Sequence, residues 1–162
     1  MVQRVWAATS YAATAKQLLH LYKFEHVQAA FGTIAEAMDE ALPLLPPEIV
    51  VVPLPTATSR VRQRGYDHAR LLARTIAAKR QLLYLPILHR LTQTRQVGAT
   101  RQQRLGQLQG AFWVSRTKLL GGHSVLLIDD VATTGASLTH AAQSLMQAGA
   151  QTVEALVFAQ RQ

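Results

Sequence analysis

The stretch VLLIDDVATTGAS (residues 125–137) runs from four apolar residues into two adjacent aspartates, and a short turn of small and hydroxyl-bearing residues follows. The apolar run predicts a strand buried in a sheet. Burying a carboxylate without a partner is costly. We therefore expect Asp129 and Asp130 to lie exposed at the end of this strand, or to face a ligand that prefers anionic oxygen.

The segments around this stretch alternate between strand and helix patterns. Strands are predicted at IVVVPLP (49–55), AFWVS (111–115), HSVLLID (123–129) and QTVEALVFAQ (151–160), with an extended stretch near residues 82–88. Apolar residues at helical spacing predict helices over residues 12–45, with a break near YKFEH (22–26), and over residues 64–80 and 137–147. This alternation favours an α/β fold in which helices flank a mainly parallel sheet, in one domain over residues 1–162.

The composition of the chain narrows the class of protein. Among 162 residues, 49% are hydrophobic and none is cysteine, which excludes disulfides and thiolate metal sites. No apolar run approaches the roughly 18 to 20 residues of a membrane span, and the start of the chain does not resemble an export signal. We therefore expect a cytoplasmic protein without a membrane span.

Positive charge is concentrated in the middle of the chain. The net charge is +8, and residues 60–104 hold ten arginines and Lys79 against a single acid, Asp67. This imbalance indicates a polyanionic partner, either a small molecule with clustered phosphates or a nucleic-acid backbone. A solvated basic surface is the alternative. The polar segment 90–110 is unusually long for a connection and is typical of a disordered stretch or a functional lid.

The turn after the aspartates has the chemistry of a phosphate site. Thr133, Thr134 and Ser137 supply hydroxyl groups, Gly135 permits close approach, and the start of the following helix supplies unpaired N–H groups. The neighbouring carboxylates suit vicinal hydroxyls, so a ribose 5-phosphate fits both halves. Simple capping of the helix is the alternative. A nucleoside-triphosphatase loop is excluded, because its Gly-x-x-x-x-Gly-Lys-Ser/Thr pattern is absent.

The same residues carry a family resemblance. VLLIDDVATTGAS resembles the phosphoribosyl pyrophosphate (PRPP) signature of type I phosphoribosyltransferases. LLHLYKFEH (18–26), residues 51–73 and residues 95–114 are similar to the competence protein F (ComF), or amidophosphoribosyltransferase-like, family. Members usually carry a four-cysteine zinc module ahead of this region, which the chain lacks. The departures Asp67 and His68, where the family has Asn and Gln, and Gln107, where it has Asn, concern second-substrate contacts.

The resemblance implies a fold and a set of site residues. The fold is a type I phosphoribosyltransferase fold, with a small helical hood in residues 1–47 and the α/β core in residues 48–162. Asp129 and Asp130 would bind the ribose, and the polar span 90–104 would form a catalytic lid. The 5-phosphate would contact the turn residues Val131, Ala132, Thr133, Thr134, Gly135, Ala136 and Ser137. Pyrophosphate would contact Pro55, Thr56, Ala57, Arg60 and Arg64, with Arg95, Arg101 and Arg104 as catalytic arginines on the lid.

The activity that the resemblance implies is phosphoribosyl transfer from PRPP to a nitrogen acceptor, such as a nucleobase or an amine, with release of pyrophosphate. Mg²⁺ is the expected cofactor, held mostly by substrate oxygens and by Asp129 and Asp130. An alternative is a ComF-like competence accessory protein that binds single-stranded DNA or competence proteins during DNA uptake. A PRPP-sensing regulator is a third candidate, and a homodimer is a further expectation. Asp67 is expected to pair with Arg64 or Arg70, or to act as a base.

Overall fold

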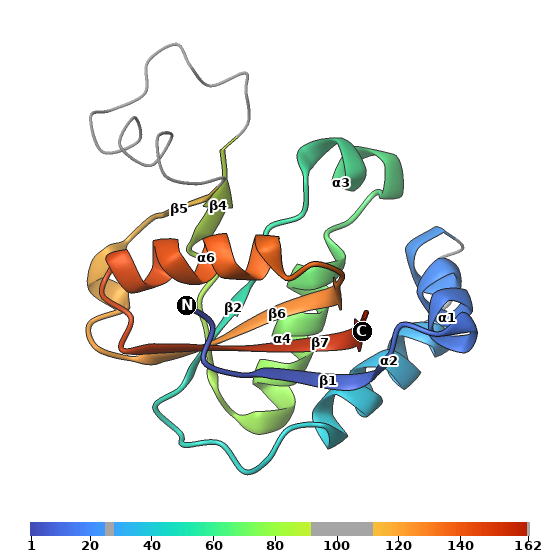
Figure 1. Cartoon of the computed structure of the whole chain (residues 1–162), viewed down its shortest axis with the longest axis horizontal. Coiled ribbons are helices and arrows are strands. Elements are labelled where there is room, and N and C mark those ends of the chain that lie inside the picture. The colour runs from blue at the N-terminus through green and yellow to red at the C-terminus, as the bar shows by residue number, and fades with distance from the viewer. Residues whose placement is uncertain (25–27, 92–111, 162) are drawn as a thin grey trace.

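A five-stranded, wholly parallel sheet forms the centre of the molecule (Figure 1). The structure is a computed structural model that describes residues 1–24, 28–91 and 112–161. The strand order is β1-β7-β6-β2-β3. The strands are β1 (Val5–Ser10), β2 (Val50–Pro53), β3 (Leu83–Tyr84), β6 (Ser124–Ala132) and β7 (Thr152–Gln160). The predicted α/β fold with a mainly parallel sheet is confirmed.

The apolar runs of the sequence become the inner strands of this sheet. All four residues of β2 are buried, as are Val125 to Ile128 in β6. β2 pairs with β6 from Val50 opposite Val125 to Pro53 opposite Ile128. Strands with helices on both faces bury both sets of side chains, which is why these runs are continuously apolar.

Helices cover both faces of the sheet. α1 (Ala13–Phe24), α2 (Gln28–Glu40) and α4 (His68–Arg80) pack on one face, against a core that includes Leu126 and Leu156. α6 (Ala136–Gln147) packs on the other face, against a core that includes Leu127 and Val157. Figure 1 shows α4 and α6 on opposite sides of the sheet. Among the described residues, none of the helices combines the length and the apolar character needed to cross a bilayer.

A second sheet, of two antiparallel strands, lies on the same face of the main sheet as α6. It consists of β4 (Leu88–Arg90) and β5 (Phe112–Val114). Leu88 and Phe112 are buried in the same core as α6, and the Ser144 hydroxyl of α6 donates to the Phe112 carbonyl at 3.2 Å. A short 3₁₀ helix, η2 (Thr117–Leu119), follows. The strand predicted at residues 111–115 is therefore present, but it lies outside the main sheet.

Three features of the structure differ from the sequence predictions. β1 was not predicted; it pairs with β7, so residues 1–47 contribute a core strand as well as helices. α3 (Thr58–Arg64) is a short helix that was not predicted, and Gly65 ends it with φ of +83°. β6 does not end at Asp129, as predicted, but continues along β7 to Ala132. Most of the predicted lid, residues 92–104, lies outside the described residues.

Candidate active site

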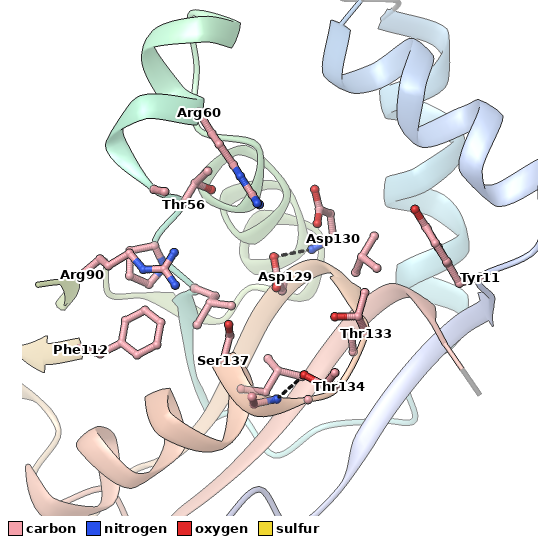
Figure 2. A pocket seen from close by; sticks show the side chains of 18 of the residues that line it. Tyr11, Thr56, Arg60, Arg90, Phe112, Asp129, Asp130, Thr133, Thr134 and Ser137 are labelled. Atoms are coloured by element: carbon pink, nitrogen blue, oxygen red, sulfur yellow. Dashed lines mark hydrogen bonds between the residues drawn. The ribbon is translucent and has the colours of Figure 1, made fainter. Parts of the chain in front are cut away.

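A cavity of about 410 Å³ opens at the carboxyl ends of β2 and β6 (Figure 2). The connection after β2 passes through α4 on one face of the sheet, and the connection after β6 passes through α6 on the other. Divergence of this kind leaves a crevice between the two strand ends, where ligands bind in open α/β sheets. The predicted acid pair, the turn after it and the loop after β2 all line this one cavity.

The acid pair lies where β6 stops pairing with β2 and continues to pair with β7 alone. Pairing with β2 ends at Ile128, whose carbonyl accepts from the Leu54 N–H at 2.8 Å. Pairing with β7 continues past Asp129, which lies opposite Val157. Asp129 and Asp130 are thus held by the sheet on one side and face the cavity on the other. The Asp130 N–H donates to Asp129 Oδ1 at 2.8 Å (Figure 2).

The two carboxylates differ in their electrostatic surroundings. Burial raises the pKa of Asp129 well above its ordinary value of 3.8. The charge of Asp130 raises this pKa further, whereas the Asp130 N–H and the Lys23 ammonium oppose the rise. Asp130 forms an ion pair with Lys23 through its Oδ2, and the two side chains are only 14% and 17% exposed. Lys23 therefore neutralises one acid, and the other remains costly to ionise.

The turn after β6 leads directly into α6. Gly135 adopts the left-handed conformation, with φ of +73° and ψ of −4°, which L side chains rarely adopt. α6 begins at Ala136, whose N–H donates to the Thr134 hydroxyl at 3.4 Å. Thr133, Thr134 and Ser137 lie around the cavity in Figure 2. The arrangement joins hydroxyl groups to the positive end of a helix, which suits an anion.

The loop after β2 forms the opposite wall. Pro55, Thr56 and Ala57 line the cavity, and Arg60 of α3 extends toward it (Figure 2). The Thr56 hydroxyl donates to Asp67 Oδ1 at 3.0 Å, which ties this loop to the start of α4. Arg64 is the last residue of α3, and its side chain lies outside the described part of the chain.

Asp67 and His68, which depart from the family pattern, both have structural roles. Asp67 caps a helix, and His68 packs in the interior. The Asp67 carboxylate caps α4 by accepting from the Arg70 N–H at 3.2 Å, and it lies 3.9 Å from the Arg70 guanidinium. The expected pairing of Asp67 with Arg70 is thus present. The His68 ring is 1% exposed and packs against Tyr22 and Tyr66, with centroids 4.7 and 4.3 Å away.

Six cavity-lining residues were not named as site residues from the sequence: Tyr11, Lys23, Leu54, Arg90, Phe112 and Leu138. Arg90 lies opposite Phe112 across the β4–β5 pair, and its guanidinium is 5.3 Å from the ring centroid. The sequence contained a signal for two of these residues, because Lys23 lies in the LYKFEH motif and Arg90 begins the polar span. The predicted arginines Arg95, Arg101 and Arg104 lie outside the described residues.

The cavity offers few ligands for a metal ion. Among residues 1–24, 28–91 and 112–161, no group of three or more His, Cys, Asp or Glu side chains is arranged to hold one. Asp129 and Asp130 are the carboxylates that line the cavity. Mg²⁺ is commonly bound through one or two carboxylates together with substrate phosphates. The residues therefore fit a metal ion that arrives with a phosphorylated substrate, and not one held by the protein alone.

The chain matches a known protein family and is similar to a curated competence protein. Residues 61–162 match the phosphoribosyl transferase domain family. Competence protein ComFC of Bacillus subtilis (strain 168) is 32% identical over 100 residues, which are 62% of this chain and 39% of that protein. The chain thus spans about two fifths of this curated relative's length.

Two solved structures share the fold. One is described as the allosteric regulatory enzyme of purine biosynthesis, with a TM-score of 0.53 and 15% identity over 78% of this chain and 25% of that chain. The other is glutamine PRPP amidotransferase from B. subtilis complexed with ADP and GMP, with a TM-score of 0.52 and 16% identity over 77% and 25%. At these identities the likeness concerns the fold alone.

Proposed function

The chain belongs to the phosphoribosyl transferase domain family, and from this premise we propose that its cavity binds PRPP and transfers the phosphoribosyl group to a nitrogen acceptor, such as a nucleobase or an amine, with release of pyrophosphate. One observation carries the proposal. A single cavity combines an acid pair, a hydroxyl-bearing turn at a helix N-terminus, and a loop with an arginine. These three parts correspond to the diol, the 5-phosphate and the pyrophosphate of PRPP.

The sugar and its phosphate would bind along the end of β6. Hydroxyl groups at positions 2 and 3 of the ribose would donate to the carboxyl oxygens of Asp129 and Asp130, whose lone pairs accept hydrogen bonds. The 5-phosphate would accept from the backbone N–H groups at the start of α6 and from the hydroxyls of Thr133, Thr134 and Ser137. Lys23 supports this assignment, because it keeps Asp130 paired with a positive charge.

Pyrophosphate would bind on the side of the β2 loop. Arg60 and Arg90 line the cavity from two different elements, α3 and β4, so they can grip phosphate oxygens from two directions. The planar guanidinium group binds such oxygens bidentately. The backbone of Pro55, Thr56 and Ala57 completes this wall. The arginines of residues 92–104 would add to it if they act as the resemblance implies.

The proposed reaction exchanges one bond at the anomeric carbon for another. The bond to the pyrophosphate oxygen breaks, and its electron pair leaves with pyrophosphate. The acceptor nitrogen bonds to the same carbon and loses a proton to solvent or to the departing pyrophosphate. Positive charge develops on the sugar, as in glycoside cleavage. Mg²⁺ bound to the pyrophosphate oxygens would neutralise the leaving group, with Asp129 and Asp130 as the carboxylates nearest to the site.

A binding and turnover assay tests this proposal. PRPP at 100 times its dissociation constant should stabilise the protein by about 2.7 kcal/mol, which raises Tm by about 5–10 °C for a chain of this size. Asp129→Asn should reduce this shift, whereas Glu36→Gln, an exposed acid on α2, should not. Pyrophosphate release with one acceptor from a panel of bases and amines would establish the transferase. Binding without release would favour the PRPP-sensing regulator, and no Tm shift would exclude the enzyme.

The outer side of α4 favours a second candidate function, binding of single-stranded DNA in a ComF-like accessory role. Arg70 and Arg74 are exposed and one helical turn apart. Burial raises the pKa of Tyr84, and the charges of Arg70 and Arg74 oppose this rise. An aromatic ring beside cations is a common platform for unpaired bases. The similarity to a competence protein supports this candidate.

Anisotropy of a labelled oligo(dT) distinguishes the two functions. Binding should weaken with added salt, with a slope of about −0.7 per phosphate contact. Charge reversal of Arg70 and Arg74 should abolish it, whereas Lys118→Ala in η2 should leave it unchanged. Tight binding that is indifferent to salt would count against this function. The cytoplasmic location, the homodimer and the competence partners are further parts of the proposal, which fractionation, light scattering and co-purification test.

A further inference from the structure

We propose that Lys23 is the resident cation of the acid pair, so that its ammonium group, and not a divalent metal ion, balances Asp130 when a sugar phosphate binds. This inference rests on the proposed function for the identity of the ligand. It concerns the diol part of the site alone, and it leaves a metal ion bound to pyrophosphate unaffected. Its consequence is that recognition of a ribose 5-phosphate, which lacks pyrophosphate, needs no metal.

The first support is the position of the ammonium group. Lys23 lies in the last turn of α1, and its Nζ forms an ion pair with Asp130 Oδ2. Both side chains are largely shielded from water, with 17% and 14% exposure, and both line the cavity. A pair on an open surface would be weak and readily exchanged. Partial burial makes this pair a fixed part of the cavity wall.

The second support is the anchoring of the helix that carries Lys23. The neighbouring Tyr22 is 1% exposed, and its hydroxyl donates to the His68 carbonyl at 3.0 Å. The Tyr66 hydroxyl in turn donates to the Tyr22 carbonyl. Tyr22 also packs against Phe31 of α2, with ring centroids 5.7 Å apart. These contacts hold the end of α1 against the start of α4, so Lys23 is directed toward β6 before any ligand binds.

The third support is the balance of charge. A divalent cation on Asp130 would have to share that carboxylate with the Lys23 ammonium, a like charge in contact with the same group. In the part of the chain that the structure describes, no third acidic or imidazole ligand joins the pair. Lys23 cancels the charge of Asp130, so at most one negative charge, that of Asp129, is left to attract a metal. Sugar hydroxyls, in contrast, need only the lone pairs that the ammonium leaves free.

Direct metal binding tests the inference on the protein alone. Mn²⁺ is titrated into the wild type and Lys23→Met, with paramagnetic resonance as the readout. We expect Lys23→Met to gain one saturable site, and Lys23→Met combined with Asp130→Asn to lose it. Lys16→Met, an exposed lysine on the same helix, should behave as the wild type. Equal binding of Mn²⁺ by the wild type and by Lys23→Met would overturn the inference.

Calorimetry with D-ribose 5-phosphate tests the consequence for the ligand. The wild type should bind equally well in EDTA and with Mn²⁺. In EDTA, Lys23→Met should bind about tenfold more weakly, because the uncompensated Asp130 carboxylate repels the phosphate, and Mn²⁺ should restore the affinity. Lys23→Arg keeps the positive charge and should behave as the wild type, which separates loss of charge from misfolding. If Mn²⁺ increases the affinity of the wild type for D-ribose 5-phosphate as much as it increases that of Lys23→Met, the inference is refuted.

The two experiments separate this inference from the proposed function. If no variant binds D-ribose 5-phosphate or PRPP under any condition, the proposed function fails. The Mn²⁺ titration still decides whether Lys23 excludes a metal ion from Asp130. If the sugar phosphate binds and depends on Mn²⁺ in the wild type, the proposed function stands and the inference about Lys23 fails.

Discussion

Gly135 offers a direct test of the proposed phosphate site. Its φ of +73° lies in the left-handed region, and an added Cβ would have no protein atom within 4 Å. Substitution by alanine therefore causes no clash with the protein, and its cost in stability comes from the backbone conformation alone. The glycine also lines the cavity, so the added methyl group occupies space at the turn that we propose as the phosphate site.

The expected size of both effects follows from this geometry. A left-handed conformation costs an L residue about 1–2 kcal/mol, which lowers Tm by about 2–8 °C for a chain of this length. Affinity for D-ribose 5-phosphate should fall about tenfold, equivalent to about 1.4 kcal/mol. The reason is that the methyl group and any relaxation of the turn disturb the N–H groups at the start of α6.

Gly122 supplies the matched control. Its φ is +82°, it also has no atom within 4 Å of an added Cβ, and it lies outside the cavity. Calorimetric unfolding should show similar losses for Gly135→Ala and Gly122→Ala. Titration with D-ribose 5-phosphate should show a loss of affinity for Gly135→Ala alone. Equal affinities in both variants would refute the assignment of this turn to the phosphate.

Three further predictions concern charge and packing. Asp129→Asn should be more stable than the wild type by about 1–3 kcal/mol at pH 7–8, because the raised pKa of Asp129 makes its ionisation in the folded state costly. Unfolding measured across pH should show this advantage vanish as the pH falls toward 3.8, the ordinary pKa of the carboxyl. Arg60→Ala should weaken PRPP binding about tenfold or more, because it removes a charge-assisted hydrogen bond. Calorimetry should show that binding of D-ribose 5-phosphate stays nearly constant in this variant. Arg62→Ala is the control, since Arg62 is on the same helix and outside the cavity lining. Leu127→Ala should cost about 2–5 kcal/mol in denaturant unfolding, since Leu127 of β6 is fully buried in the core that also contains residues of α6.

The sequence predicted the parts of the site that are contiguous in the chain. Asp129, Asp130 and the turn up to Ser137 follow one buried strand, so their placement depends on local pattern alone. The strand β2 was predicted for the same reason, because prolines bound its apolar run, whereas the role of the loop after it was implied by the family resemblance. Short-range signals of this kind also predicted α4 and α6, in which apolar residues recur at helical spacing.

The remaining parts of the site depend on contacts between distant segments. Lys23 reaches Asp130 because Tyr22 packs α1 against the start of α4; the LYKFEH motif marks Lys23 but does not indicate which residue it contacts. Arg90 joins the cavity because β4 pairs with β5, beyond the polar span. β1 was missed because VWAATS is short and only weakly apolar, and its pairing partner β7 is at the other end of the chain.

The divergence of α4 and α6 has a consequence for the mechanics of the molecule. The cavity lies on the seam between β2 and β6, which are joined by four paired positions. Beyond these positions the two strand ends belong to separate loops, one tied to α4 through Asp67 and the other continuous with α6. A ligand that touches both loops bridges the two halves of the sheet. Substrate occupancy therefore adds a crosslink at the point where the sheet's own hydrogen bonds end, and amide exchange should slow on both sides of the seam together.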